Sequence, residues 1–272
     1  MNHRGFVAPT MMGFAQALSR PLMSEEIARR RGLLQALDPR VRVVGLLALV
    51  LADTFSRRLS IVLGLCALAV VIAVLSKVSI GTLVKRVWLI VLVFTGVIAL
   101  PAIFVTPGDR MATLAGGSLH ITRQGLTAAA LLIARVETAV TFTTLLILCT
   151  PWAHVLKALH SFGLPNELTA MLAMTHRYVF LLVEAAGQML ESRQSRRVGR
   201  LTAGEERRLA ARTVGVLLSK SIELSNDVYL AMQSRGFEGE VRVLSDFSMQ
   251  PLDYAGLFAF LAASVAAVWI GR

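Results

Sequence analysis

Apolar residues gather in five blocks along the chain, at 41–55, 59–75, 87–105, 125–150 and 252–270. A helix rises 1.5 Å per residue, so the blocks 87–105 and 125–150 are long enough to cross about 30 Å of hydrocarbon. The block 41–55 is short for a complete span and is compatible with a tilted or partly interfacial helix. The pattern predicts an all-α, polytopic membrane protein with about five transmembrane helices.

The residues between the fourth and fifth blocks, 151–250, have a different pattern, which predicts two long amphipathic helices. Gly163 and Pro165 indicate the end of one helical segment and the start of the next. The first long helix is expected from 167 to about 197. Its apolar positions recur every three to four residues, at Met171, Met174, Tyr178, Leu181, Leu182, Ala185 and Met189.

The second long helix is expected to start at Thr202, because Thr202 and Glu205 have the spacing of a capping box. Gly199 is the expected cap of the helix before it, and Gly236 follows the last turn of the second helix. The apolar stripe of this second helix comprises Ala210, Val214, Leu217, Leu224, Val228 and Ala231.

Positive charge is distributed unevenly between the segments that separate the blocks. Of the 28 Lys and Arg residues, 22 lie in 1–42, 77–86 and 151–250. Five lie in the segments on the other side, at Arg57, Arg58, Arg110, Arg123 and Arg272. Basic residues favour the cytoplasmic side, so we expect a cell inner membrane protein with a cytoplasmic N terminus and an outer C terminus.

The same asymmetry explains the net charge of +11 without a nucleic-acid partner. Hydrophobic residues make up 55% of the 272-residue chain and charged residues 17%, which is more apolar than an average soluble domain.

From the apolar blocks and the charge asymmetry together, we expect four parts of the chain. These are a cytoplasmic N-terminal segment (1–36), membrane helices 1–4 (37–150), a cytoplasmic-side helical region (151–250) and a C-terminal membrane helix (251–272).

Signatures of catalysis or of nucleotide binding are not found in the sequence. It has no GxxxxGK[ST] loop, no HExxH and no G-x-S-x-G. Both cysteines, Cys66 and Cys149, lie inside apolar blocks, and His154 and His160 are six residues apart, which does not place them on one helix face. We therefore expect a non-catalytic protein with no catalytic, cofactor-binding or metal-binding residues of its own.

Two charged residues, Arg135 and Glu137, lie inside the fourth apolar block. Ions at membrane depth are costly and normally face protein or water. Being two residues apart, they lie on different faces of a helix. They are candidates either for structural partners of neighbouring helices or for a contact with another membrane subunit.

Arginines gather near the predicted ends of both long helices. Arg193, Arg196, Arg197 and Arg200 would form one stripe on a continuous helix, and Arg235 lies in the last turn of the second. Arginine is favourable at the negative end of a helix dipole, so these residues are compatible with simple helix termination. Exposed arginines at two cytoplasmic helix ends also suit docking into acidic grooves of a partner, because guanidinium pairs with carboxylates bidentately.

Three stretches carry a resemblance to a known family: LDPRVRVVGLLALVLA (37–52), HRYVFLLVEAAGQMLESRQSRR (176–197) and AMQSRGFEGE (231–240). With the pattern of spans, the chain resembles the transmembrane T component of energy-coupling factor importers, and is most similar to the cobalt-type permease CbiQ. These importers are ATP-binding-cassette uptake systems for vitamins and metal ions. In them, two short Ala-Arg-Gly-like motifs at the ends of two coupling helices each dock on one ATPase subunit.

The resemblance implies a docking motif at the end of each long helix. The implied positions are Ser195, Arg196 and Arg197 in the first motif and Ser234, Arg235 and Gly236 in the second. Serine replaces alanine in both motifs, and Arg197 stands where the first motif has glycine. Arg193 remains an alternative docking residue for the first motif.

The resemblance further implies a scaffold that binds two ATPase subunits and a substrate-binding S component within the lipid bilayer. ATP would be hydrolysed on the partners, with no cofactor on this chain, and the substrate would be cobalt or nickel. The alternative is a secondary transporter or channel that works alone, which requires polar residues converging on a pathway at the membrane midplane. Arg135, Glu137 and Pro101 are its candidates. A non-transporting membrane scaffold is a third hypothesis.

Overall fold

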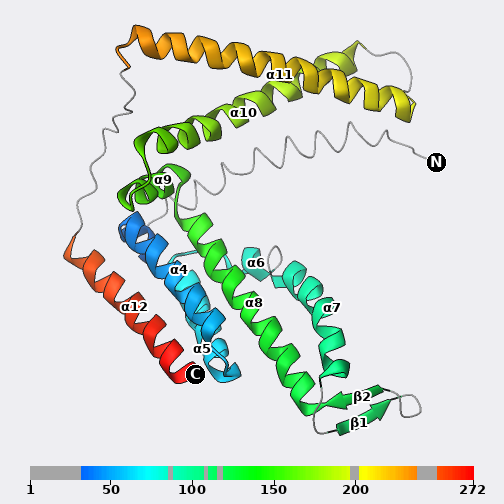
Figure 1. Ribbon diagram of the computed structural model, residues 1–272, viewed down its shortest axis with the longest axis vertical. Helices are drawn as coiled ribbons and strands as arrows, with labels where there is room; N and C mark the ends of the chain where they lie inside the picture. The colour runs from blue at the N-terminus through cyan, green and yellow to red at the C-terminus, as the bar shows by residue number, and fades with distance from the viewer. Residues whose placement is uncertain (1–31, 85–87, 107–109, 115–118, 197–201, 238–249) are drawn as a thin grey trace. The chain divides into compact units, whose positions relative to one another are not determined.

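The computed structural model describes residues 32–84, 88–106, 110–114, 119–196, 202–237 and 250–272 (Figure 1). The chain divides into two compact units. We call the first the helix bundle; it comprises the described residues from 32 to 158 together with 250–272. We call the second the helix pair; it comprises 159–196 and 202–237.

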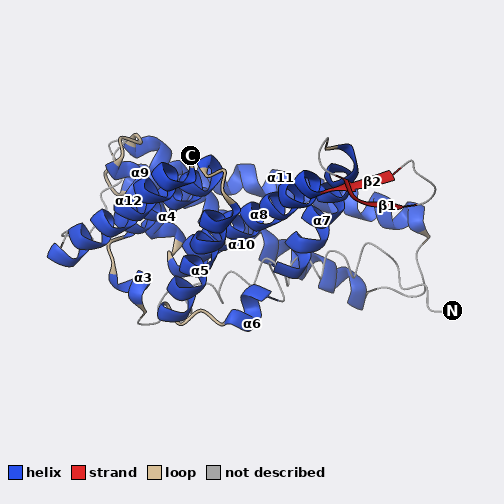
Figure 2. Ribbon diagram, turned by 90° about the horizontal axis from the view of Figure 1, so that it is seen from below, coloured by secondary structure: helices blue, strands red, loops and turns tan. Residues whose placement is uncertain are grey.

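Helix accounts for nearly all of the described chain, as Figure 2 shows. The helices of the bundle are α3 (Leu33–Ala36), α4 (Pro39–Phe55), α5 (Leu59–Leu75), α6 (Ile80–Leu83), α7 (Leu89–Val105), α8 (Arg123–Cys149), most of α9 (Trp152–Ser161) and α12 (Pro251–Gly271). The helix pair consists of α10 (Asn166–Ser195) and α11 (Ala203–Ser234). The predicted all-α class is confirmed.

One element was not predicted. Strands β1 (Arg110–Leu114) and β2 (Leu119–Thr122) form an antiparallel hairpin between α7 and α8, with Thr113 opposite His120. Hydropathy does not indicate this hairpin, because it lies in the polar segment between two apolar blocks and its stability depends on pairing between strands.

Four predicted blocks correspond closely to α5, α7, α8 and α12. Length and composition allow α8 and α12 to cross a membrane, and α5 and α7 are shorter apolar helices. The same criterion selects residues 166–193 of α10, which the sequence pattern places on the cytoplasmic side. Composition alone does not separate a span from a long helix with one apolar face, so the cytoplasmic location of α10 stays a prediction.

Helix α4 begins two residues before the predicted block because Asp38 caps it. The Asp38 carboxylate accepts a hydrogen bond from the backbone N–H of Arg40 at 2.8 Å, and Pro39 occupies the first turn. Aspartate at the N-cap followed by proline is a favourable start for a helix, because the aspartate accepts from an orphan donor of the first turn and the proline has no N–H to satisfy. At 17 residues, α4 is the short first helix that the sequence indicates.

The core of the bundle forms where α4 and α5 pack on α8 and where α12 packs on α4 (Figure 1). Leu49 of α4 and Phe142 and Leu145 of α8 are fully buried. At Gly45 of α4, a Cβ atom would lie 2.5 Å from the ring of Phe260 on α12, so only glycine permits this close crossing. Small residues at helix crossings are typical of membrane bundles, where close packing holds the helices together.

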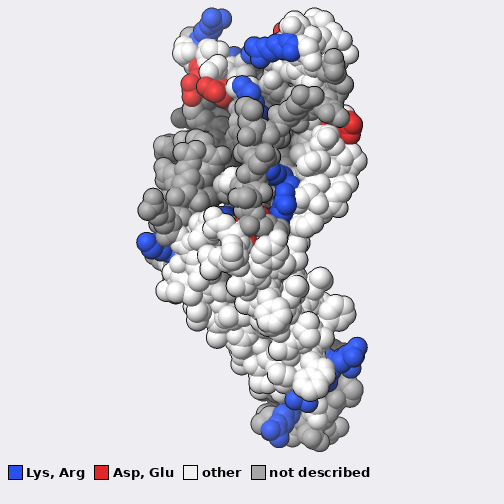
Figure 3. All heavy atoms as spheres, turned by 90° about the vertical axis from the view of Figure 1, so that its left-hand side faces the viewer, with Lys and Arg blue, Asp and Glu red and all other residues white. Residues whose placement is uncertain are grey.

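The outer surface of the bundle is apolar. Phe94 on α7 is 71% exposed, and Phe258 and Trp269 on α12 are 76% and 83% exposed. In the space-filling view of Figure 3, the bundle surface is almost free of charge over most of its length, with basic residues at its end. An apolar surface of this extent is far larger than a soluble monomer presents and fits a lipid environment.

Candidate functional site: two arginine-bearing helix ends

The first arginine-bearing end lies where α10 stops. Helix α10 ends at Ser195, whose hydroxyl donates to two backbone carbonyls of the preceding turn at 3.0 and 3.1 Å. Arg196 follows the last helical residue and is exposed, whereas Arg193, in the last turn, is half-buried. Arg197 and the predicted cap Gly199 lie outside the described residues. Exposure thus favours Arg196 over Arg193 as the accessible residue of this end.

The second end has a complete helix cap. Gly236 adopts the left-handed conformation, with a φ of +78°, immediately after Arg235. The N–H of Phe237 donates to the carbonyl of Met232, and the N–H of Gly236 donates to that of Gln233, both at 3.0 Å. These two bonds define a Schellman motif, which satisfies carbonyls that a helix end otherwise leaves unpaired. The backbone after Arg235 therefore favours glycine.

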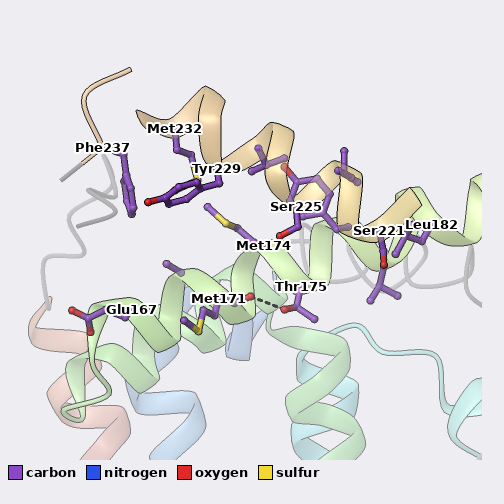
Figure 4. Close-up of a pocket in the computed structure, with 15 residues that line it drawn as sticks. Glu167, Met171, Met174, Thr175, Leu182, Ser221, Ser225, Tyr229, Met232 and Phe237 are labelled. Atoms are coloured by element: carbon purple, nitrogen blue, oxygen red, sulfur yellow. Dashed lines mark hydrogen bonds between the residues drawn. The ribbon is translucent and has the colours of Figure 1, made fainter. Parts of the chain in front are cut away.

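An apolar contact accompanies this cap. Phe237 and Met232 line the same cavity, next to Tyr229 one turn earlier, and the three side chains lie together at one end of it (Figure 4). Gln233 donates from its amide nitrogen to the Tyr229 hydroxyl at 2.9 Å. A contact between these positions is common in Schellman motifs. The motif therefore fixes the direction in which the chain leaves α11, and with it the position of Arg235.

Arg235 itself is available for an external partner. The residue is exposed, and within the described chain its guanidinium has no hydrogen-bond or salt-bridge partner. The neighbouring Ser234 hydroxyl is occupied by the carbonyl of Ala231 at 3.0 Å. A positive charge at this end is stabilised by the helix dipole, so helix termination and docking are compatible uses of the same arginine.

Between α10 and α11 lies an open apolar cavity of about 660 Å³ (Figure 4). Its walls are mostly apolar, with Glu167 as the one charged residue among those that line it. From α10 come Met171, Met174, Tyr178 and Leu182, and from α11 come Leu224, Val228 and Met232. We call this cavity the groove. Flexible, polarisable methionines suit a surface that adapts to an apolar partner.

The predicted apolar stripes account for much of the groove. Four of the seven positions predicted for α10 line it, and two of the six predicted for α11 do so. Val214 of the predicted α11 stripe is instead 59% exposed. The capping box at Thr202 and Glu205 is confirmed, as are the helix stop at Gly163, where the backbone has a positive φ, and the start of α10 after Pro165. Local sequence rules therefore located both helix starts correctly.

Arg135 has partners within the chain. It extends from α8 to the end of α4, where its guanidinium donates to the backbone carbonyl of Ser56 at 2.5 Å. Asp53 of α4 is fully buried near Arg135, and neither of its carboxylate oxygens has a hydrogen-bond partner among the described residues. This geometry favours the structural role for Arg135. Asp53 was missed by sequence reasoning, although a carboxylate inside a predicted span is itself a signal of a buried ionic partner.

Glu137 is separate from this pair. It is 9% exposed, and neither carboxylate oxygen has a hydrogen-bond partner within the described residues. One turn later, Thr141 accepts a hydrogen bond from the indole N–H of Trp88 at 3.0 Å. Arg135 and Glu137 therefore do not pair with each other, and a contact of either residue with a second subunit stays a prediction.

Within the described ranges, no group of three or more His, Cys, Asp or Glu side chains is arranged to hold a metal ion. The imidazole of His154 lies in a partly buried, cationic environment. Burial lowers the pKa of its imidazole, and the nearby cations Arg42 and Lys157 lower it further, which favours the neutral ring.

Comparison with known proteins agrees with the sequence resemblance. The family model CbiQ, described as cobalt transport protein, matches residues 31–244. An uncharacterized protein of Methanocaldococcus jannaschii is 32% identical over 83% of this chain and 78% of its own length. The cobalt transport protein CbiQ of Rhodobacter capsulatus is 28% identical over 75% of this chain and 82% of its own. The energy-coupling factor transporter transmembrane protein EcfT of Thermanaerovibrio acidaminovorans is 32% identical over 76% and 79%.

Proposed function

The chain belongs to the CbiQ family of cobalt transport proteins, and from that premise we propose that it is the coupling subunit of an energy-coupling factor importer. In this role it transmits ATP-driven motion of two partner ATPases to a substrate-binding membrane subunit. The chain is a non-catalytic component, and ATP is hydrolysed on the partners.

The carrying observation is Arg235, which stands exposed on a completed helix cap and has no partner among the residues that the structure describes. Its guanidinium stands where two backbone hydrogen bonds and an apolar contact fix the chain. An arginine whose backbone is held in this way loses less conformational freedom when it binds a carboxylate than an arginine in a loose loop does. We assign Arg235 to one ATPase and Arg196, at the end of α10, to the second copy.

Helix α11 is suited to transmit a displacement. It has 32 residues, which corresponds to a length of about 48 Å, and a complete capping box starts it. A continuous helix moves as a rigid body, so a shift at Arg235 reaches the side chains that line the groove.

We propose that the groove and the apolar faces of α10 and α11 hold the substrate-binding S component. The walls contributed by Met171, Met174 and Met232 fit apolar side chains of a membrane protein without demanding one shape. Cobalt, or alternatively nickel, is the proposed substrate, on the basis of the family. The metal ligands are assigned to the partner subunit.

We further propose that the protein resides in the cell inner membrane with a cytoplasmic N terminus, which places both arginine-bearing ends beside the ATPases. A transporter that works alone is less well supported. Arg135 is engaged by α4, and Glu137 is buried apart from it, so the two do not converge on one pathway.

The test is charge reversal of both docking residues in the full complex. The double variant Arg196→Glu and Arg235→Glu is compared with Arg212→Glu, which makes the same kind of charge reversal at one exposed position in the first third of α11. Repulsion at a buried contact costs about 2–5 kcal/mol, so ATPase binding should weaken at least about 30-fold. Copurification of the ATPases and uptake of radioactive cobalt and nickel into proteoliposomes are measured.

Loss of both binding and uptake in the double variant, with both retained in Arg212→Glu, is the expected result. Normal ATPase binding and uptake in the double variant would refute the docking role. Uptake of nickel in preference to cobalt would correct the substrate and leave the coupling role intact.

A further inference from the structure

The segment 35–42 contains LDPRVR, the start of the stretch 37–52 that carries part of the family resemblance, yet the docking role does not use it. It joins α3 to α4 within the helix bundle. We call it the junction segment. Its groups are hydrogen-bonded to the ends of three other helices.

The first connection is made by Arg42, which is only 5% exposed. Its NH1 group donates to the carbonyl of Cys149, the last residue of α8, at 2.8 Å. Its remaining N–H groups donate to the carbonyls of Leu37, at 2.8 and 2.6 Å, and of Gln35, at 3.0 Å. Arg42 therefore bridges the junction segment and the negative end of the α8 dipole, where a buried cation is favourable.

The second connection holds the start of α12. The backbone N–H of Asp38 donates to one carboxylate oxygen of Asp253 at 2.6 Å. The other oxygen of Asp253 accepts from the N–H of Gln250 at 2.8 Å, as part of the capping box of α12. Asp253 is 5% exposed, so this charge-assisted bond is shielded from water.

A third connection reaches the end of α5. The amide nitrogen of Gln35 donates to the carbonyl of Ser76 at 3.1 Å, and the Ser76 hydroxyl accepts from the N–H of Leu34 at 3.3 Å. Ser76 is the C-cap of α5 and is fully buried. The junction segment thus binds the ends of α5 and α8 and the start of α12 around the start of α4.

The position of these bonds along the chain suggests their use. The chain passes from the bundle to the helix pair after 158, shortly beyond Cys149, and it returns at 247, shortly before Asp253. The helices on either side of the helix pair in the chain, α8 before it and α12 after it, are therefore both held to the same eight-residue segment by buried hydrogen bonds that involve charged side chains.

We propose that the junction segment is the mechanical joint of the protein, with Arg42 and Asp253 as its positioning residues. This inference rests on the proposed coupling function. A displacement of the helix pair enters the bundle along α8 and α12, and the joint makes both helices move with α4 as one body. Without Arg42, the end of α8 shifts alone and the motion is lost.

A purely stabilising role for Arg42 makes a different prediction. Loss of stability lowers the amount of folded protein, the binding of ATPases and the uptake of substrate together. Loss of a joint leaves the folded protein and its ATPase contacts intact and removes uptake alone, so that ATP is hydrolysed without transport.

The experiment uses the complete transporter with Arg42→Gln in the full chain. Glutamine keeps a polar side chain but removes the fork that bridges two helix ends. The control is Arg58→Gln, an exposed arginine at the turn between α4 and α5. We expect uptake to fall about tenfold or more in Arg42→Gln, because hydrogen bonds to a buried charge are lost. ATPase copurification and ATP hydrolysis per complex should equal those of the control.

A second measurement keeps Arg42, so it does not depend on whether the Arg42→Gln variant folds. Spin labels are placed at exposed positions Ala36 and Ala153, and in a second sample at Ala36 and Leu252, after Cys66→Ser; the fully buried Cys149 is kept because it belongs to the joint. In the joint, both distances stay constant when nucleotide binds. Labels at Ala36 of the bundle and Leu230 of α11, both exposed, report whether the helix pair moves relative to the bundle.

Each outcome decides the proposal. The proposal is supported if Arg42→Gln loses uptake but retains ATPase binding and hydrolysis. It is also supported if the joint distances stay constant while the helix pair moves. Uptake equal to the control, or loss of uptake and ATPase binding together, overturns it. If Arg42→Gln does not fold, the spin-label distances measured without this substitution decide. A change of about 5 Å, one helical turn, in either joint distance when nucleotide binds overturns the proposal. If the helix pair itself is static, the coupling function fails and the joint with it, whereas failure of the joint leaves the effect of Arg235→Glu unchanged.

Discussion

The cap after Arg235 offers a test of how backbone conformation controls docking. Gly236 has a φ of +78°, and a Cβ added there would meet nothing within 4 Å. Substitution by alanine therefore introduces no clash and changes only the backbone energy. A non-glycine residue in the left-handed region costs about 1–2 kcal/mol.

That cost determines how far docking should weaken. If Gly236→Ala lowers the population of the intact cap, the apparent affinity falls by the same factor. A penalty of about 1–2 kcal/mol corresponds to a reduction of up to about 5- to 30-fold. Gly236→Asn should be milder, since asparagine visits this conformation more readily.

The assay measures the affinity of the purified full-length protein for its ATPase partner by surface plasmon resonance. Two glycine controls separate the causes. Gly215→Ala lies inside α11, in open space and without a positive φ, and should leave docking unchanged. Gly163→Ala carries the same kind of strain at φ +98°, but in the turn after α9, and should affect stability without affecting this contact.

The reasoning is refuted if Gly236→Ala binds the ATPase as well as Gly215→Ala does. It is also refuted if Gly236→Asn is as damaging as alanine, because the glycine would then be needed for space or contact. Amide hydrogen exchange at Phe237, whose N–H is bonded to the carbonyl of Met232, gives an independent reading of the cap.

Two further predictions concern the bundle and the groove. Arg135→Met should destabilise the protein by about 3–5 kcal/mol, because it leaves Asp53 buried without its cation, and Asp53→Asn combined with Arg135→Met should recover most of the loss. Chemical unfolding in detergent measures both, and equal stability of the single and double variants would contradict the pairing. Met174→Asp places a charge in the groove and should abolish copurification of the S component while ATPase binding persists. Arg177→Asp, on the exposed face of α10, is its control, and retention of the S component by Met174→Asp would exclude the groove as its binding surface.

Features controlled by neighbouring residues were predictable from the sequence. The capping box at Thr202 and Glu205 was recognisable from spacing, and so was the glycine after Arg235. Both depend on hydrogen bonds within one turn of helix, and such bonds depend little on the rest of the fold. The apolar blocks were equally clear, because burial in lipid acts on each helix as a whole.

Phe237 was not identified from the sequence as part of the docking end. An apolar residue directly after a capping glycine is the relevant signal, since it packs back on the helix in a Schellman motif. Its significance becomes visible only when Tyr229 and Met232 are found in the same cavity.

The sequence by itself determined the helical class, the apolar spans, the two long amphipathic helices and the arginines at their ends, because these follow from periodicity and local capping. Only the tertiary structure decided that Arg42 bridges to Cys149, that Arg135 bonds to Ser56 near Asp53 and that Asp38 is bonded to Asp253. The last of these pairs is separated by 215 residues. A charged side chain in an apolar environment must find a partner, but which partner it finds depends on how the helices pack, and no local pattern in the chain encodes that choice.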